Sequence, residues 1–222
     1  RAENVEVEGV FTHLPISDVP EGEDFTRREI STFMDAVSRI EAERGPFPLV
    51  HLANSGAILG HDLGRTSMVR AGIVGYGYDP DPHAGRAELH PALSWVSHVT
   101  FVKTVNPGDT IGYGRTWTAG ETTKIATVPV GYADGLSRAL SNKGRVLIGG
   151  AVHPIVGRVC MDQFMVDLGP DSTATVGDEV VLIGTQEDEV LTADDMAEQL
   201  GTISYEITCD ISKRVDRHWT GE

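Results

Sequence analysis

The sequence predicts a mixed α/β domain followed by a domain built almost entirely of β-strands. Strand-like and helix-like segments alternate over the first 88 residues, which is typical of a parallel sheet, either open or closed into a barrel. From residue 89 onward, short β-rich runs are separated by turn residues, as in an all-β barrel or sandwich. We therefore assign residues 1–88 to the first domain and residues 89–222 to the second, with the connection in the Asp-, Pro- and Gly-rich loop 78–86.

The first domain begins with an apolar run at residues 9–13, which is consistent with a buried parallel strand. The next segment predicts a helix that ends at Gly45-Pro46, because its apolar residues recur close to every 3.6 positions. Those apolar residues are Phe25, Ile30, Phe33, Met34, Val37 and Ile40. A second strand is predicted at 48–53 and a third at 68–71, so that strand and helix alternate as in a β-α-β unit.

The second domain is predicted from its closely spaced β-rich runs. One helix interrupts them, opened by Thr192 with Asp195 three residues later, which resembles a capping box. We expect Leu191, Met196 and Leu200 to face the core. The predicted strands lie at residues 95–105, 123–130, 145–148, 154–159, 163–168 and 179–183.

The composition limits which binding partners and which cellular compartment we expect. The formal net charge of −15 argues against binding to nucleic acid or to anionic membrane surfaces. No apolar run approaches the roughly 18 residues that a membrane span needs. Cys160 and Cys209 do not make a disulfide framework, so we expect a reducing cytoplasm.

Three basic side chains lie at or near the ends of predicted strands, namely His13, His51 and Arg70. A single histidine in such a place is more often structural. Three basic residues from neighbouring parallel strands would instead face one mouth of the sheet, where active sites are built. No carboxylate or further histidine has convincing ligand spacing, so we predict no metal site.

Two turns could bind a phosphate group. Asn54-Ser55-Gly56 and Arg70-Ala71-Gly72-Ile73 follow strands, and exposed N–H groups with a serine hydroxyl can hold an anion there. The alternative, an ordinary turn with serine as a helix cap, fits the residues equally well.

Tyr113 is the most unusual residue of the second domain, because Gly112 and Gly114 flank it and leave room for close approach. Tyrosine is a poor base at neutral pH, since the phenol ordinarily ionises near pH 10. Gly131 to Gly135 could be only a hairpin-type turn, and residues 157–163 combine a possible buried strand with two charges. Cys160 is expected to pack rather than react. These residues alone do not identify a reaction.

Taken together, the segments resemble the alanine racemase family of pyridoxal-phosphate enzymes, which interconvert L- and D-alanine. The resemblance covers essentially the whole chain, with the segments in the family's order. It implies the last part of an N-terminal (β/α)₈ barrel over residues 1–88, followed by a β-rich domain. The segments that carry it are Thr12-His13, Val50-His51-Leu52-Ala53-Asn54-Ser55-Gly56, Met68-Val69-Arg70-Ala71-Gly72-Ile73, Tyr113-Gly114-Arg115-Thr116-Trp117, Gly131-Tyr132-Ala133-Asp134-Gly135, Gly157-Arg158-Val159-Cys160-Met161-Asp162-Gln163 and Ser204-Tyr205-Glu206.

The resemblance implies an acid/base role for Tyr113, which would reach the substrate in the partner subunit of a homodimer. A lysine that also carries the cofactor would work on the opposite face of the substrate Cα. Racemisation needs groups on both faces, because a proton removed from one side must return on the other. His13 and Arg70 match the hydrogen-bonded network beside the tyrosine, where a cation would favour tyrosinate.

The same resemblance implies the binding residues. Arg70 would face the pyridine nitrogen of pyridoxal 5'-phosphate, with His51 also at the cofactor. The phosphate would be held by Ser55, Gly72, Ile73 and Tyr205. The substrate would be bound by Met161, Tyr132 and Arg158, with Asp18, Arg138 and Ile203 also resembling residues of the entryway.

One departure from the family concerns the lysine that anchors the cofactor. The family carries it in a motif near the start of the barrel, and no lysine of this sequence has a matching context. We therefore expect the chain to be the carboxyl-terminal part of a longer protein, with the lysine-bearing remainder as its partner.

The expected function is interconversion of L- and D-alanine, which supplies D-alanine for peptidoglycan. A racemase of serine or another small amino acid, or a non-catalytic segment that binds pyridoxal phosphate, is the alternative.

Overall fold

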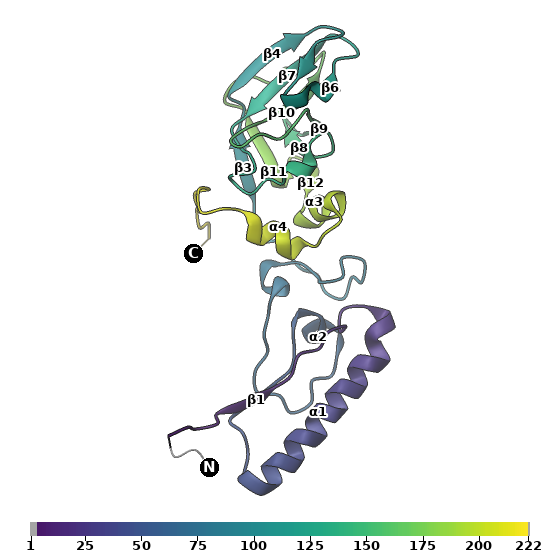
Figure 1. The fold of residues 1–222 in the computed structure, drawn as a ribbon, viewed down its shortest axis with the longest axis vertical. Coiled ribbons are helices and arrows are strands. Elements are labelled where there is room, and N and C mark those ends of the chain that lie inside the picture. Colours follow the sequence, from purple (N-terminus) through teal and green to yellow (C-terminus); the bar gives the residue numbers. More distant parts are fainter. Residues whose placement is uncertain (1–3, 222) are drawn as a thin grey trace. The chain divides into compact units, whose positions relative to one another are not determined.

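The computed structural model describes residues 4–221 and divides them into two compact units, one ending at Ala92 and one beginning at Leu93. The first unit is mixed α/β and the second is rich in antiparallel strands (Figure 1). This confirms the predicted α/β class followed by a β-rich class. None of the helices among the described residues has the length and apolarity needed to cross a membrane.

The first unit is organised around two parallel strands, β1 (Gly9–Phe11) and β2 (Leu49–His51), which pair from Gly9↔Leu49 to Phe11↔His51. Between them lie the 3₁₀ turn η1 (Pro20–Gly22) and the long helix α1 (Glu23–Arg44). After β2 come α2 (Ser55–Gly60) and the 3₁₀ turn η2 (Ile73–Tyr76). The predicted first strand is thus shorter than expected, because it ends at Phe11.

Helix α1 packs through the middle of its predicted apolar stripe. Ile30, Phe33 and Met34 pack against a buried cluster that contains Leu52 and Ala57. Phe25 and Ile40, at the two ends of the stripe, are exposed. The helix ends where expected, because Gly45 takes a φ of 89° and its N–H donates to the Glu41 carbonyl.

The predicted third strand at 68–71 is wrong, because this segment is not a regular strand. It runs beside β2 with only two backbone hydrogen bonds, from Ser67 to Val50 and from Arg70 to Ala53, both 2.9 Å. The donors are three residues apart, whereas a parallel ladder repeats every two. In addition, the Ser67 hydroxyl accepts the Val50 N–H, which takes the place of a ladder carbonyl.

The second unit contains an eight-stranded sheet with the order β12-β11-β8-β9-β10-β7-β4, in which β3 also pairs with β11. Its pairings are antiparallel. The strands are β3 (Trp95–His98), β4 (Phe101–Val105), β7 (Thr123–Val128), β8 (Arg145–Ile148), β9 (Ala151–Val156), β10 (Phe164–Gly169), β11 (Glu179–Gln186) and β12 (Glu189–Leu191).

The predicted single strand at 95–105 is divided by Val99 and Thr100. The Val99 N–H donates to Asp178, whereas the Thr100 N–H donates to Thr127. As a result β3 pairs with β11 and β4 pairs with β7, which lie near opposite ends of the strand order. Two residues therefore join these ends, so the sheet must curl round on itself.

The second unit also contains several smaller elements. A small two-stranded sheet, β5 (Thr110–Ile111) with β6 (Trp117–Thr118), encloses the 3₁₀ turn η3 (Tyr113–Arg115). A further 3₁₀ turn, η4 (Arg138–Leu140), precedes β8. Helices α3 (Ala193–Leu200) and α4 (Ser204–Asp210) follow β12.

The predicted start of α3 is confirmed. The Thr192 side chain accepts the Asp195 N–H at 3.0 Å, and the Asp195 carboxylate accepts the Thr192 N–H at 2.7 Å. Leu191 and Met196 are buried and Leu200 is half-buried. The capping box therefore fixes where the helix begins, and the apolar side chains fix which face it buries.

Candidate functional site

Arg70 is the centre of the polar site of the first unit, and the structure brings it together with both predicted histidines. Its guanidinium lies 2.7 Å from His51 Nδ1 and 3.2 Å from His13 Nδ1. It also donates to the carbonyls of Thr12 at 3.0 Å and Leu52 at 3.3 Å. Because arginine only donates, the facing histidine nitrogens must be acceptors. Arg70 thereby fixes the tautomers of both rings.

The surroundings of His51 favour its neutral ring. Burial lowers the pKa of His51 below its usual value, and the positive charge of Arg70 lowers it further. The ring stacks on Phe11, with centroids 5.2 Å apart and planes inclined by 6°. Arg70 also lies over the Phe11 ring, 5.8 Å from its centroid. The three side chains therefore hold one another in place at the end of the β1–β2 pair.

Ser55 is 2% exposed and begins α2, and its hydroxyl oxygen accepts the N–H groups of Gly72 at 3.1 Å and Val74 at 3.3 Å. It does not cap the helix, because that role belongs to Asn54, whose side chain accepts the Ala57 N–H at 3.1 Å. The alternative of serine as helix cap is therefore excluded. The hydroxyl joins the two predicted phosphate turns.

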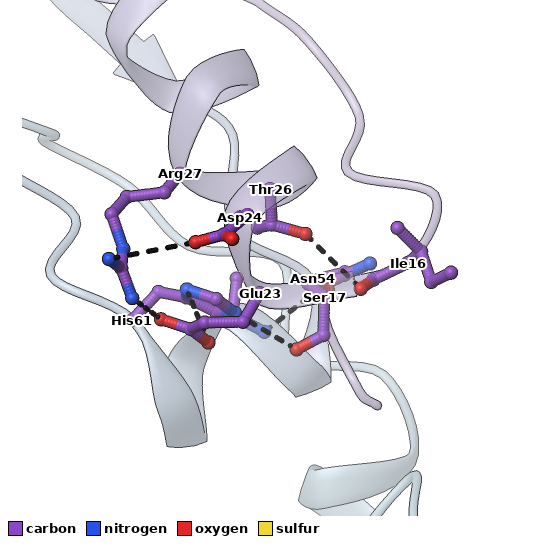
Figure 2. A network of polar contacts seen from close by, with 9 residues as sticks. Ile16, Ser17, Glu23, Asp24, Thr26, Arg27, Asn54 and His61 are labelled. Carbon is purple, nitrogen blue, oxygen red and sulfur yellow. Dashed lines mark hydrogen bonds and ion pairs between the residues drawn. The ribbon is translucent and has the colours of Figure 1, made fainter. Parts of the chain in front are cut away.

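A polar network fastens this turn to the start of α1 (Figure 2). The Ser17 hydroxyl donates to the Asn54 side chain at 2.7 Å, and His61 Nε2 lies 3.1 Å from the Ser17 carbonyl oxygen. Arg27 pairs with Glu23 at 2.6 Å, and His61 Nδ1 lies 3.8 Å from the same carboxylate. The first turn of α2, which carries Ser55, is thus held by residues that precede it in the chain, in addition to Gly72 and Val74, which follow it.

The second unit contains an open cleft of about 550 Å³. The predicted residues Tyr113, Tyr132, Arg158 and Met161 all line it, as does Arg138. The other lining residues are Val159, Cys160, Asp162 and Gln163. The structure therefore gathers the motifs of residues 113–117, 131–135 and 157–163 around one space.

Tyr113 projects from η3 with 76% of its surface exposed. Gly112 before it has a φ of 73° and Gly114 after it a φ of 74°, which is backbone that favours glycine. A Cβ on Gly112 would lie 3.1 Å from the Arg158 nitrogen. Glycine at 112 therefore serves both the turn and its close packing on the loop that carries Arg158.

The Tyr132 turn and the Met161 loop are joined through their backbones. The Tyr132 N–H donates to the Cys160 carbonyl and the Ala133 N–H to the Met161 carbonyl, each at 3.0 Å. A Cβ on Gly131 would lie 2.2 Å from the Met161 carbonyl oxygen, so only glycine allows this contact. Residues 157–163 form a loop rather than the buried strand considered from the sequence.

Cys160 is half-buried in this loop, with its sulfur 3.5 Å from the Arg158 carbonyl oxygen. Burial raises the pKa of its thiol, although the charge of Arg138 acts in the opposite direction. A raised pKa disfavours the reactive thiolate. The surroundings of Cys160 therefore favour its neutral thiol.

Sequence reasoning missed Arg214, which joins the two loops from the segment after α4. Its guanidinium lies 2.7 Å from the Asp162 carboxylate and 3.4 Å from that of Asp134. Asp134 in turn accepts the Gly131 N–H at 2.8 Å. Nothing local in the sequence marks Arg214, because its partners are distant in the chain.

The remaining predicted residues are placed as follows. Tyr205 is half-buried on α4 and is not among the residues that line the cleft. Ile203 is the exposed residue before α4, and Asp18 is half-buried. His13, His51, Ser55, Gly72, Ile73 and Arg70 belong to the first unit, whereas Tyr113, Tyr132, Arg158, Met161 and Tyr205 belong to the second. Among residues 4–221, no three His, Cys, Asp or Glu side chains are grouped so that they could hold a metal ion.

Comparison with known proteins gives the family. A family model described as "Alanine racemase, N-terminal domain" matches residues 1–80, and one described as "Alanine racemase, C-terminal domain" matches residues 92–219. An alanine racemase of Cutibacterium acnes is 86% identical over 222 residues, which is 100% of this chain and 59% of that protein. One of Symbiobacterium thermophilum is 46% identical, with the same two coverages.

Solved structures agree. The alanine racemase of a D-cycloserine-producing Streptomyces lavendulae superposes with a TM-score of 0.90 at 38% identity, covering 98% of this chain and 57% of that one. A Clostridium difficile 630 alanine racemase in complex with cycloserine has a TM-score of 0.88 at 42% identity, covering 97% and 56%. The chain thus spans somewhat less than three-fifths of the length of these relatives. The expectation of a partial barrel followed by a β-rich domain is confirmed, and the chain belongs to the alanine racemase family.

Proposed function

We propose that the protein containing this chain interconverts L- and D-alanine with pyridoxal 5'-phosphate, in the cytoplasm, and so supplies D-alanine for peptidoglycan. The proposal rests on two residues with defined surroundings. Arg70 is bonded to two histidines in one unit, and the exposed Tyr113 lines a cleft with Arg138 and Arg158 in the other. The relatives that the chain matches over nearly its whole length are named alanine racemases, which supports the choice of substrate.

We assign the binding of pyridoxal phosphate mainly to the first unit. The phosphate would meet the buried Ser55 hydroxyl and the turn at Gly72 and Ile73, which the Gly72 N–H ties to that hydroxyl. Tyr205, from the second unit, would be a further phosphate ligand. Arg70 and His51 would face the pyridine ring. When bound, the cofactor supplies the conjugated ring that delocalises negative charge left at the substrate Cα. Because Arg70 can only donate, it would keep the ring nitrogen an acceptor and moderate that delocalisation.

Proton transfer at Cα requires a group on each face. We assign one face to Tyr113, offered by the partner subunit of a homodimer, and the other to the cofactor-anchoring lysine in the amino-terminal remainder of the protein. His13 and Arg70 would be the neighbours of the tyrosine hydroxyl in the assembled site. Its 76% exposure in the described chain is what a side chain offered to another surface requires.

The substrate would enter past Tyr132, Arg158, Arg138, Asp18 and Ile203. A carboxylate only accepts hydrogen bonds, so the N–H is the group of the Met161 backbone that would meet the substrate carboxylate. A carboxylate is the part of alanine that a donor can orient, since its methyl group offers no polar contact.

The proposal is tested with the assembled protein, that is, this chain together with its lysine-bearing remainder. L-Alanine and L-serine are each incubated with the protein, with and without added pyridoxal phosphate, and the D-enantiomers are measured by chiral chromatography. We expect D-alanine to form, only with the cofactor, and faster than D-serine. Faster formation of D-serine would move the assignment to a serine racemase. No D-product from protein that has bound the cofactor would indicate a non-catalytic binding protein.

A further inference from the structure

We propose that Asn142 is a positioning residue that holds the Tyr113 turn against the cleft loop at Gly157. The inference rests on the acid/base role assigned to Tyr113 under the proposed function. It concerns how this chain fixes the tyrosine, and it is carried by the backbone of the turn and by two hydrogen bonds of the Asn142 amide.

The turn that carries Tyr113 has an unusual backbone. Gly112, Gly114 and Arg115 all have positive φ, of 73°, 74° and 48°. Apart from glycines, Arg115, Asn142 and Glu187 are the only residues with positive φ in the described part of the chain. Such conformations persist when the surrounding structure determines them. Within the turn itself, Arg115 donates from its backbone to Gly112 at 3.3 Å, which is a long bond.

Asn142 provides an external restraint at the end of this turn. Its amide nitrogen donates to the Thr116 hydroxyl at 3.1 Å, and its amide oxygen accepts the Gly157 N–H at 2.6 Å. Thr116 is the residue that directly follows η3 as its C-cap. The start of the same turn packs on the same loop, because Gly112 lies against Gly157 and Arg158. The Tyr113 turn is therefore attached to one cleft loop at both of its ends.

The residue type suits this bridge. A side-chain amide can donate through one atom and accept through the other at the same time. Asparagine also tolerates left-handed backbone better than most residues, and Asn142 has a φ of 59°. Its neighbour Ser141 is bonded to the same loop, since its hydroxyl accepts the Val159 N–H at 3.0 Å and donates to Arg138 at 2.6 Å. The segment before β8 is thus bonded to the cleft loop at Gly157 and Val159, and the Asn142 amide also bonds it to the Tyr113 turn.

Loss of the bridge should change the rate of proton transfer more than substrate binding. The residues assigned to bind the substrate, Tyr132, Arg158 and Met161, lie on loops that Asn142 does not hold by itself, because backbone bonds and Arg214 also join them. A tyrosine that is displaced by a fraction of an ångström still leaves the cleft intact. Such displacement lowers kcat, because acid/base groups act only within hydrogen-bond reach of the proton that they move.

Three variants separate the parts of the bridge in the assembled holoenzyme. Asn142→Gly removes both hydrogen bonds and keeps a backbone that allows positive φ. Thr116→Val removes the bond to Thr116 and leaves the bond to Gly157 in place. The double variant Asn142→Gly/Thr116→Val completes a mutant cycle. The control is Lys143→Ala, which changes the exposed neighbouring residue.

We expect kcat to fall about tenfold in Asn142→Gly and about threefold in Thr116→Val, with KM within about twofold of the unmodified enzyme. The double variant should lose no more than Asn142→Gly, because that substitution already removes the bond to Thr116. Lys143→Ala should retain the unmodified kcat. A merely structural role would lower the thermal midpoint and the amount of active enzyme, and the effects of Asn142→Gly and Thr116→Val on kcat would add in the double variant.

Amide hydrogen exchange over residues 112–117 is measured on the same variants, and it does not depend on activity. Faster exchange in Asn142→Gly than in Lys143→Ala supports the bridge, even if the unmodified protein fails to racemise alanine and the proposed function falls. Unchanged exchange overturns the bridge. Faster exchange combined with an unmodified kcat overturns the positioning role and leaves the proposed function standing.

Discussion

Arg70 shows how one residue can organise a site through hydrogen bonds alone. It contacts both histidines, two carbonyls and the face of Phe11. Each of these partners is an acceptor or an electron-rich ring face, and none is a carboxylate among the contacts described for it. The guanidinium therefore keeps its positive charge available for whatever is bound in front of it. Its identity as a site residue followed from its place beside a strand end, even though that strand proved irregular.

The lowered pKa of His51 predicts a pH-dependent stability. Burial and then the charge of Arg70 disfavour the protonated ring in the folded state, so the unfolded chain binds this proton more readily. The stability due to a neutral His51 is therefore complete above the unfolded value of about 6.5 and is lost as the pH falls below it. Urea unfolding of the unmodified protein and of His51→Gln, at pH 8 down to about pH 5, measures the effect.

The expected result is that the difference in stability between the two proteins shrinks as the pH falls. Both proteins contain the same carboxylates, so taking the difference removes the contribution of those groups to the free energy of unfolding. A difference that stays constant from pH 8 to about pH 5 would show that His51 is no less readily protonated in the folded state than in the unfolded one.

Ser55 predicts a coupled loss of stability and cofactor affinity. Its buried hydroxyl accepts two backbone N–H groups, so Ser55→Ala leaves both donors without this partner. We expect the free energy of unfolding to fall by about 1–2 kcal/mol and the affinity of the assembled protein for pyridoxal phosphate to fall as well. Chemical denaturation and a cofactor titration measure the two effects. Ser38→Ala, on the exposed side of α1, is the control, and equal effects of the two substitutions would remove Ser55 from the site.

At the scale of the elements, the turns carry the site and the strands position them. Each of the three loops around the cleft contains a glycine whose backbone contacts another loop, and Gly131 makes the closest of these approaches. Because a Cβ at 131 would meet the backbone of Met161 rather than a flexible side chain, the neighbour cannot move aside at little cost.

Gly131→Ala should therefore separate the Tyr132 turn from the Met161 loop. We expect the free energy of unfolding to fall by about 1–3 kcal/mol, as in other overpacked sites, with faster hydrogen exchange at Tyr132 and Ala133. Gly120→Ala is a matched control in the same unit, since a Cβ there meets nothing within 4 Å. If the two substitutions had equal effects on stability, the close contact at Gly131 would not be a constraint.

The elements also show where sequence patterns stop being informative. The helices at 23–44 and 193–200 follow from local apolar spacing and end signals, and both were predicted. The segment at 68–71 has the composition of a strand but not the register, because register depends on the partner strand. The break at Val99 and Thr100 has the same origin, since these two neighbouring N–H groups donate to Asp178 and Thr127, which belong to different parts of the sheet.

For the whole molecule, the candidate site was predictable where residues act through local motifs. The turns of Ser55, Tyr113, Tyr132 and Met161 each carry their own signature of glycines and polar residues. Arg214 was not predictable, because its bond to Asp162 joins residues 52 apart in the chain, and Asn142 lies in a turn with an ordinary composition. Residues that position others depend on tertiary contacts, which a local pattern does not encode.

The two units divide the proposed chemistry between them. The first would hold the cofactor around Arg70 and Ser55, and the second offers Tyr113 over the cleft. Under the proposed function neither unit is sufficient alone, since the opposite face of the substrate needs the lysine of the remainder. The clearest consequence is that removing Tyr113 should stop proton transfer on one face and spare the other.

The measurement that tests this most directly is exchange of the alanine Cα hydrogen in D₂O by the assembled protein carrying Tyr113→Phe. Each enantiomer is supplied separately, and deuterium at Cα is followed by proton NMR. We predict that the variant retains pyridoxal phosphate and exchanges the Cα hydrogen of one enantiomer while exchange of the other falls by at least about a hundredfold. Undiminished exchange from both enantiomers would contradict the assignment of Tyr113 as the acid/base group of one face.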